Sequence, residues 1–189
     1  MARNMDTAGP RRRNRWSLVI WGTAAFLLLL PAIAMRFPGS GVDWDARDFT
    51  AMGVMFLIAC ASYEVVARIS ENTAYRAASG IAIVTAFLTV WVNLAVGMLG
   101  SERNPANLLF GGVLAIALVG ALLARFRPRG MARAMQAAAT AQAAMALYAL
   151  LGGFAEVTLH VGLFALPWLL SAQLFKKAAR EVAAVAEVA

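Results

Sequence analysis

Residues 105–124 read PANLLFGGVLAIALVGALLA and carry no charged side chain. A helix of roughly 20 apolar residues can cross the hydrocarbon core of a bilayer, which is about 30 Å thick. This stretch therefore predicts a transmembrane helix. Five further segments are similarly long and apolar, so we expect six spans at residues 16–35, 49–67, 77–99, 105–124, 134–155 and 157–175.

The composition indicates a chain that lies almost entirely in the membrane. Of its 189 residues, 61% are hydrophobic, whereas soluble domains are usually about 45–50% apolar. We predict an all-α fold, an integral membrane helical bundle of six transmembrane helices that forms a single domain over residues 1–189. The short loops leave no room for a separate soluble domain.

The basic residues fall mostly on one side of these spans. An N-terminus in the cytoplasm places 14 basic residues inside and three outside, and short cytoplasmic loops are enriched in Lys and Arg. We therefore predict an N-in/C-in topology. The inside set is Arg3, Arg11, Arg12, Arg13, Arg15, Arg68, Arg76, Arg125, Arg127, Arg129, Arg133, Lys176, Lys177 and Arg180, and the outside set is Arg36, Arg47 and Arg103.

The same distribution bears on partners and location. The net charge of +7 sits at span ends, where membrane topology places it, so we expect the lipid bilayer and no nucleic acid as a partner. Arginine outnumbers lysine 15 to 2, which is typical of a GC-rich bacterial genome. We predict a multi-pass protein of the bacterial inner membrane.

The first and fifth segments each have a second interpretation. A basic region, an apolar run and AIA at residues 32–34 are also typical of a cleaved signal peptide. The length of the run and the anchors Trp16 and Trp21 favour a span instead.

The fifth segment is rich in alanine and contains Gln136, Thr140 and Gln142. This composition favours a helix enclosed by other helices, and a helix lying on the inner surface is the alternative. Its expected small-residue faces are Ala137, Ala141 and Met145, and Ala139, Ala143 and Leu147.

Two polar residues inside predicted spans are candidate functional positions. Glu64 lies one turn from the inner end of the second span, and Arg68 follows at i+4, so a helical ion pair is expected. A carboxylate within a span can also handle protons or substrate. Asn93 lies in the outer half of the third span, where a buried amide needs partners. It is expected to bond between helices, or to line a polar cavity with Gln142 or Thr89.

The loop GSERNPAN, residues 100–107, contains three further candidates, Glu102, Asn104 and Asn107. Asn104 followed by Pro105 predicts a helix start, because asparagine caps the first N–H groups and proline suits the first helical position. The tripeptide NPA also occurs in water channels, but here it is a single copy in a loop. Glu102 leaves an exposed binding site as an alternative interpretation.

The outer residues give little indication of catalysis or metal binding. Asp43, Asp45 and Asp48 are expected to be solvated, with Asp48 capping the second span. His160, the last candidate position, follows Glu156 by one turn and could pair with it. No nucleophile, phosphate-binding or metal-binding motif is present, so we predict no enzymatic activity, no catalytic residues, no cofactor and no metal.

Residues 91–135 contain WVNLAVG, then GSE, NPAN and RPRGMA. This order resembles a family of uncharacterised bacterial multi-spanning inner-membrane proteins, which also share the Tyr63-Glu64 pair and the closing WLLSAQLFKKAARE. The resemblance implies a polytopic membrane protein and no particular activity. We expect a structural or regulatory membrane component that associates with itself or with another membrane protein, and a small-solute or proton-coupled transporter or channel is the alternative.

Overall fold

The computed structural model describes residues 15–188, which form helices and no strand. Six segments of this region are long and apolar enough to cross a membrane, which confirms the predicted fold class. Residues 1–14, with Arg3 and the run 11–13, lie outside the described residues. The elements are α1 (Arg15–Ala34), α2 (Ala46–Ile69), α3 (Thr73–Ala95), η1 (Pro105–Leu108), α4 (Leu109–Leu123), α5 (Pro128–Leu151), α6 (Ala155–Leu163) and α7 (Ala165–Val188).

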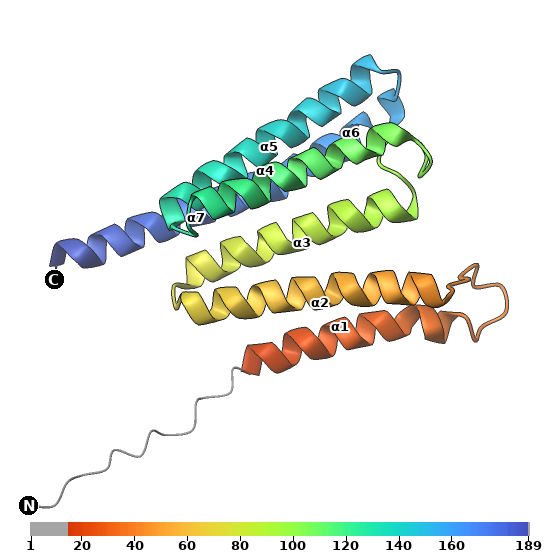
Figure 1. Cartoon of the computed structure of the whole chain (residues 1–189), viewed down its shortest axis with the longest axis horizontal. Coiled ribbons are helices and arrows are strands. Elements are labelled where there is room, and N and C mark those ends of the chain that lie inside the picture. Colours follow the sequence, from red (N-terminus) through yellow and green to blue (C-terminus); the bar gives the residue numbers. More distant parts are fainter. Residues whose placement is uncertain (1–14, 189) are drawn as a thin grey trace, which may run out of the picture. The chain divides into compact units, whose positions relative to one another are not determined.

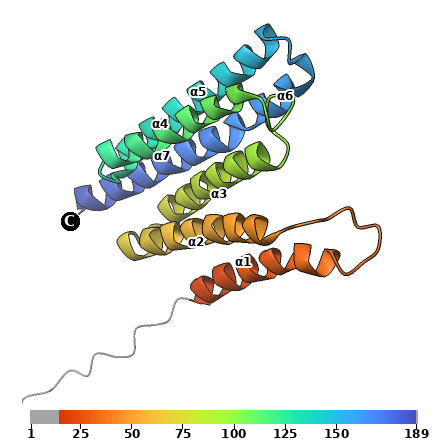
Figure 2. The same ribbon diagram turned by 45° about the vertical axis from the view of Figure 1, so that its right-hand side comes forward.

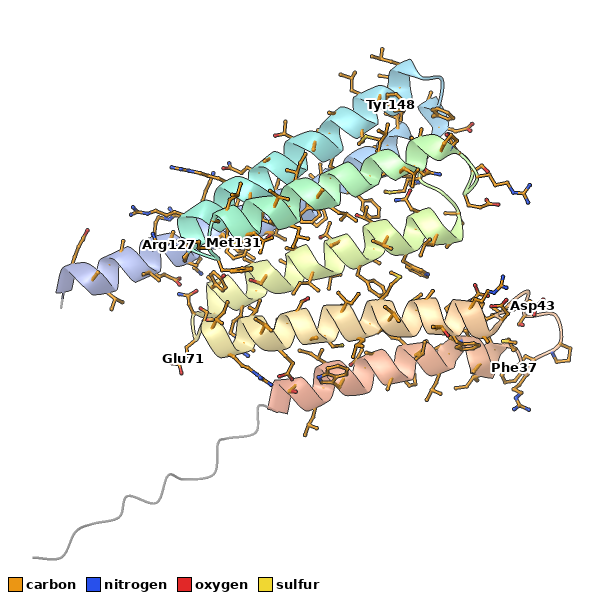
Figure 3. All side chains as sticks on the ribbon, viewed as in Figure 1. Phe37, Asp43, Glu71, Arg127, Met131 and Tyr148 are labelled. Atoms are coloured by element: carbon orange, nitrogen blue, oxygen red, sulfur yellow. The ribbon has the colours of Figure 1, made fainter. Side chains whose placement is uncertain are left out.

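The chain divides into two compact units, residues 1–60 and 61–189, with the division inside α2. In the first unit, the side chain of Leu28 on α1 faces Gly53 on α2. The loop between these helices carries Phe37 and Asp43 (Figure 3). At its end the rings of Trp44 and Phe49 meet edge to face, 5.3 Å apart.

Helix α2 begins at residue 46, three residues earlier than predicted, because Asp45 rather than Asp48 caps it. The Asp45 carboxylate accepts hydrogen bonds from the N–H groups of Arg47 and Asp48, at 2.6 and 3.1 Å. Asp48 in turn accepts one from the Asp45 N–H at 2.9 Å. This reciprocal pattern is a capping box. The predicted role of Asp48 as the cap itself was therefore wrong.

The second unit is built around α5, which contacts α4, α6 and α7, while α3 packs against α7. Both views show α4, α5 and α7 side by side (Figures 1 and 2). The core between them contains the fully buried side chains of Phe110, Trp168 and Phe175. Ser171 on α7 donates to the Ala78 carbonyl of α3 at 2.8 Å, so these two helices are joined by a buried hydrogen bond.

Helix α5 packs against three other helices, as its composition predicted, but one side of it is exposed and the predicted faces were only partly right. Its buried face contains Ala138, Gln142, Met145 and Ala149. Three residues expected at helix contacts, Ala137, Ala143 and Leu147, are exposed instead. Alanines surround the whole helix, so composition could not show which face turns inward.

The turn that joins α4 to α5 has an unusual backbone conformation. Arg125 and Phe126 both have positive φ, 49° and 57°. Their N–H groups bond to the carbonyls of Leu122 and Ala121, which ends α4. Tyr75 of α3 donates its hydroxyl to the Phe126 carbonyl at 2.7 Å, so this turn is tied to a third helix.

Gly120 sets the distance between α4 and α5. A Cβ at this position would lie 2.7 Å from the Cβ of Ala134, well inside van der Waals contact. Gly120→Ala should therefore destabilise the protein by about 1–3 kcal/mol, because the helices must separate. The control is Gly112→Ala on the same helix, where no atom lies within 4 Å of the added Cβ. Titration with SDS in dodecyl maltoside micelles would measure the stability of both variants. Equal stability of the two variants would contradict the close approach of α4 and α5 at Gly120.

The sixth span is broken into α6 and α7 at Phe164. Pro167 explains the break, because proline has no N–H to offer the carbonyl four residues earlier and its ring crowds that turn. The carbonyl of Val161, three residues before Phe164, accepts a hydrogen bond from Gln142 Nε2 at 2.9 Å. A buried amide on α5 thus bonds to the backbone of α6 near the break.

Two other spans start earlier than predicted because specific residues begin their helices. Helix α3 starts at Thr73, four residues early, where Asn72 accepts a hydrogen bond from the Tyr75 N–H. Helix α5 starts at Pro128, six residues early, with proline in the first helical turn.

Candidate functional site

Glu64 forms the ion pair that its spacing predicted. Its carboxylate lies 3.5 Å from the Arg68 guanidinium, one helical turn away on α2. The Glu64 side chain is 24% exposed and that of Arg68 is 79% exposed. The pair thus lets the carboxylate sit partly buried while the arginine reaches outward.

Asn93 makes its hydrogen bond within its own helix rather than across to another. Its Nδ2 donates to the Thr89 carbonyl at 2.7 Å. Thr89 and Thr85 bond back in the same way, to residues four positions earlier, so polar side chains follow one line along α3. The Asn93 Oδ1 is buried and has no partner among the described residues. The expected bond between helices is therefore absent from this part of the chain.

Asn104 and Asn107 hold the loop between α3 and α4 in shape. Asn104 caps η1 as predicted, since its Oδ1 accepts from the Ala106 N–H at 3.0 Å. Its Nδ2 donates to the Leu99 carbonyl at 2.9 Å. Asn107 reaches back across the loop, accepting from the Leu99 N–H at 2.9 Å and donating to the Ser101 carbonyl at 2.7 Å. Both amides thus satisfy loop backbone.

Glu102 and His160, the other candidates, are exposed. Glu102 lies 3.9 Å from the Arg103 guanidinium, and both side chains face solvent. The His160 side chain makes no hydrogen bond or ion pair within residues 15–188, so its expected pair with Glu156 is not formed there. Groups of three or more acidic, histidine or cysteine side chains suited to a metal are also missing from this region.

The polar residues within the spans do not meet in one place. Glu64 lies near the end of α2 that leads into α3, whereas Asn93 lies 20 positions along α3 from Thr73, about 30 Å at 1.5 Å per residue. Gln142 lies midway along α5 and bonds to Val161. Each of these side chains is therefore used by its own or an adjacent helix.

The two ends of the second unit differ in charge. At one end, here called the basic end, Asn72 donates to Glu181 at 2.7 Å and Tyr75 bonds to Phe126, which joins the α2–α3 turn, the α4–α5 turn and α7. Glu71, Arg127 and Met131 mark this end, and Tyr148 marks the other (Figure 3). Basic residues at or near it are Arg68, Arg76, Arg125, Arg127, Arg129, Arg133, Lys176, Lys177 and Arg180. Arg103 is the one basic residue at the opposite end of the described unit.

An open groove of about 620 Å³ lies at the basic end between α5 and α7. Four basic side chains line this basic groove, Arg129 and Arg133 from α5 with Lys176 and Arg180 from α7. Its other lining residues are Ala132, Gln136, Gln173, Ala179, Ala183, Ala184 and Glu187. The sequence did not reveal the groove, because its two pairs of cations are more than 40 positions apart and each resembles an ordinary topology signal.

Comparisons with known proteins add no relative. The chain matches no protein-family model, no curated protein and no solved structure. The resemblance to a bacterial inner-membrane family stays a prediction.

Proposed function

We propose that this protein is a non-enzymatic structural or regulatory component of the bacterial inner membrane, which associates with itself or with another membrane protein. The observation that carries the proposal is the use of the polar side chains inside the second unit. Asn107 and Gln142 bond to backbone carbonyls or N–H groups of the fold, and Glu64 pairs with Arg68. Polar groups used in this way support helix packing rather than a reaction.

The outward faces of α4 and α5 suggest where a partner would bind. Helix α4 exposes large apolar side chains such as Leu118 and Leu122, which suit lipid. Helix α5 exposes Ala137, Thr140 and Ala144 at helical spacing. Small residues let another helix approach closely, so we place the protein contact on this face of α5.

Site-directed photocrosslinking in native membranes tests this proposal. A photoreactive amino acid at position 137 or 144 should give discrete protein adducts, whereas the same residue at position 118 or 122 should not. Mass spectrometry of the adducts would distinguish a second copy from another protein. An absence of protein adducts at both α5 positions, with the protein correctly inserted, would contradict the proposed contact face.

The alternative function, a small-solute or proton-coupled transporter or channel, has one observation in its favour. Within the described residues, four buried polar atoms lack a hydrogen-bond partner, namely Ser79 Oγ, Asn93 Oδ1, Gln142 Oε1 and Trp168 Nε1. Such groups usually bind water or another partner. Proteoliposomes containing a pH-sensitive dye would test proton flux. Flux that Glu64→Gln abolishes in a normally folded protein would favour transport over the structural proposal.

The N-in/C-in topology is part of the same proposal, and it makes its own prediction. The joined turns of the basic end support it, since cytoplasmic loops are enriched in basic residues. A reporter active only in the periplasm should work when fused after residue 44, 103 or 156, and should be silent after residue 72 or 129. The reverse pattern would overturn the topology.

A further inference from the structure

We propose that the basic groove binds the phosphate group of an anionic phospholipid. Its four cations lie on two facing helices, and the carboxylate of Glu187 is the one acidic group in the described lining. Within residues 15–188, the ion pairs are Arg68–Glu64, Arg103–Glu102 and Lys177–Glu181. The four groove cations take part in none of them, so their charge is available to an anion.

Nearby carboxylates do not neutralise the groove, because Glu187 offsets at most one of its four positive charges. Glu181 is on α7, but it accepts a hydrogen bond from Asn72 and pairs with Lys177, neither of which lines the groove. Arginine offers a planar fork of N–H donors that matches a phosphate. Arg133 and Arg180 can present two such forks from opposite walls.

The height of the groove along the helices matches lipid headgroups. In α5 no charged residue follows Arg133, and the remaining 18 residues, 134–151, are about 27 Å long, close to the thickness of a hydrocarbon core of about 30 Å. Arg129 and Arg133 lie in the first two turns of α5. The two α5 cations of the groove therefore lie just before the uncharged part of this helix, at the level where lipid phosphates occur.

On α7, the face that lines the groove becomes apolar in the turns that precede the cations, which favours a lipid over a soluble anion. Gln173 lines the groove on α7. Leu169 and Leu166, four and seven positions earlier on that helix, are 42% and 57% exposed. Residues at this spacing share a helix face. A lipid with its phosphate among the cations would thus lay an acyl chain along these leucines.

Binding of phosphatidylglycerol to the delipidated full chain in dodecyl maltoside tests the proposal, with phosphatidylcholine and inorganic phosphate as comparison ligands. Native mass spectrometry would measure the bound lipid. Each cation contributes about fivefold to binding an anionic surface, so Arg133→Gln with Arg180→Gln should weaken phosphatidylglycerol binding roughly 25-fold. Replacement of both by lysine keeps the charge but not the planar forks, and should restore part of the affinity.

The charge-matched control is Arg47→Gln with Arg103→Gln, which removes two exposed arginines outside the groove. It should change phosphatidylglycerol binding by less than about twofold. Equal weakening by both double variants would overturn the site, as would unchanged binding in the groove variant. Inorganic phosphate that binds as tightly as phosphatidylglycerol would instead indicate a soluble-anion site. Circular dichroism would check that each variant folds. If the Arg133→Gln, Arg180→Gln variant does not fold, Lys176→Gln alone replaces it and is expected to weaken binding about fivefold.

Discussion

Asn107→Ala should lower the free energy of unfolding by about 2–4 kcal/mol, because it leaves the buried Leu99 N–H without a partner and removes one of the two hydrogen bonds to the Ser101 carbonyl, which keeps the bond from the Asn104 N–H. The N–H of Leu99 and the carbonyl of Ser101 both bond to the Asn107 amide. Leu99 is fully buried, so water cannot readily replace the lost bond. SDS titration in dodecyl maltoside micelles, followed by circular dichroism, would measure the change.

Two variants of the same loop act as controls for Asn107→Ala. Asn104→Ser keeps an oxygen for the Ala106 N–H and loses the bond to the Leu99 carbonyl, so about 0.5–1.5 kcal/mol is expected. Arg103→Ala removes an exposed side chain and should change stability by less than about 0.5 kcal/mol. A loss for Asn107→Ala no larger than that for Arg103→Ala would show that the amide does not hold the loop.

Gly97→Ala is expected to have the largest effect of any single methyl addition in this loop. Gly97 has a φ of +72°, and a Cβ there would overlap the backbone carbonyl of Ser101 and lie 2.6 Å from the Glu102 nitrogen. The left-handed conformation costs an L-residue about 1–2 kcal/mol, and the overlap adds about 1–3 kcal/mol. The sum, about 2–5 kcal/mol, should appear in the same SDS titration.

Gly153→Ala separates the two contributions to that loss. Gly153 has a φ of +83°, but no atom lies within 4 Å of an added Cβ. This variant should therefore show only the conformational cost of about 1–2 kcal/mol. Equal losses of stability for Gly97→Ala and Gly153→Ala would mean that the backbone of residues 101 and 102 shifts away from the added Cβ at no measurable cost.

The six spans could be predicted because each is a local property of the chain. About 20 apolar residues suffice to cross a bilayer whatever their neighbours are. Short signals at span ends were less certain, since neighbouring residues compete for the same role. Asn104 was correctly predicted as a cap, but at the second span Asp45 took the role expected of Asp48.

Whether the partner of a candidate residue could be predicted from the sequence depended on how far apart the two residues lie along the chain. Glu64 and Arg68 are one turn apart, and the predicted pair is present. Gln142 bonds to Val161, 19 positions away, because the fold brings α5 and α6 into contact. Pro167 in the sequence indicates a break in the sixth span, but it does not show which amide bonds to the Val161 carbonyl.

By itself, the sequence determined that this chain is a bundle of apolar helices with its basic residues concentrated in one set of turns, because both depend on the order of residues along each segment. Only the tertiary structure decided which face of α5 is buried and which cations face each other across the basic groove. Alanine is nearly equivalent on every side of a helix, so close contacts such as that of Gly120 with Ala134 set the rotation of α5. That rotation depends on residues distant in the sequence, and it brings Arg129 and Arg133 to the same groove as Lys176 and Arg180.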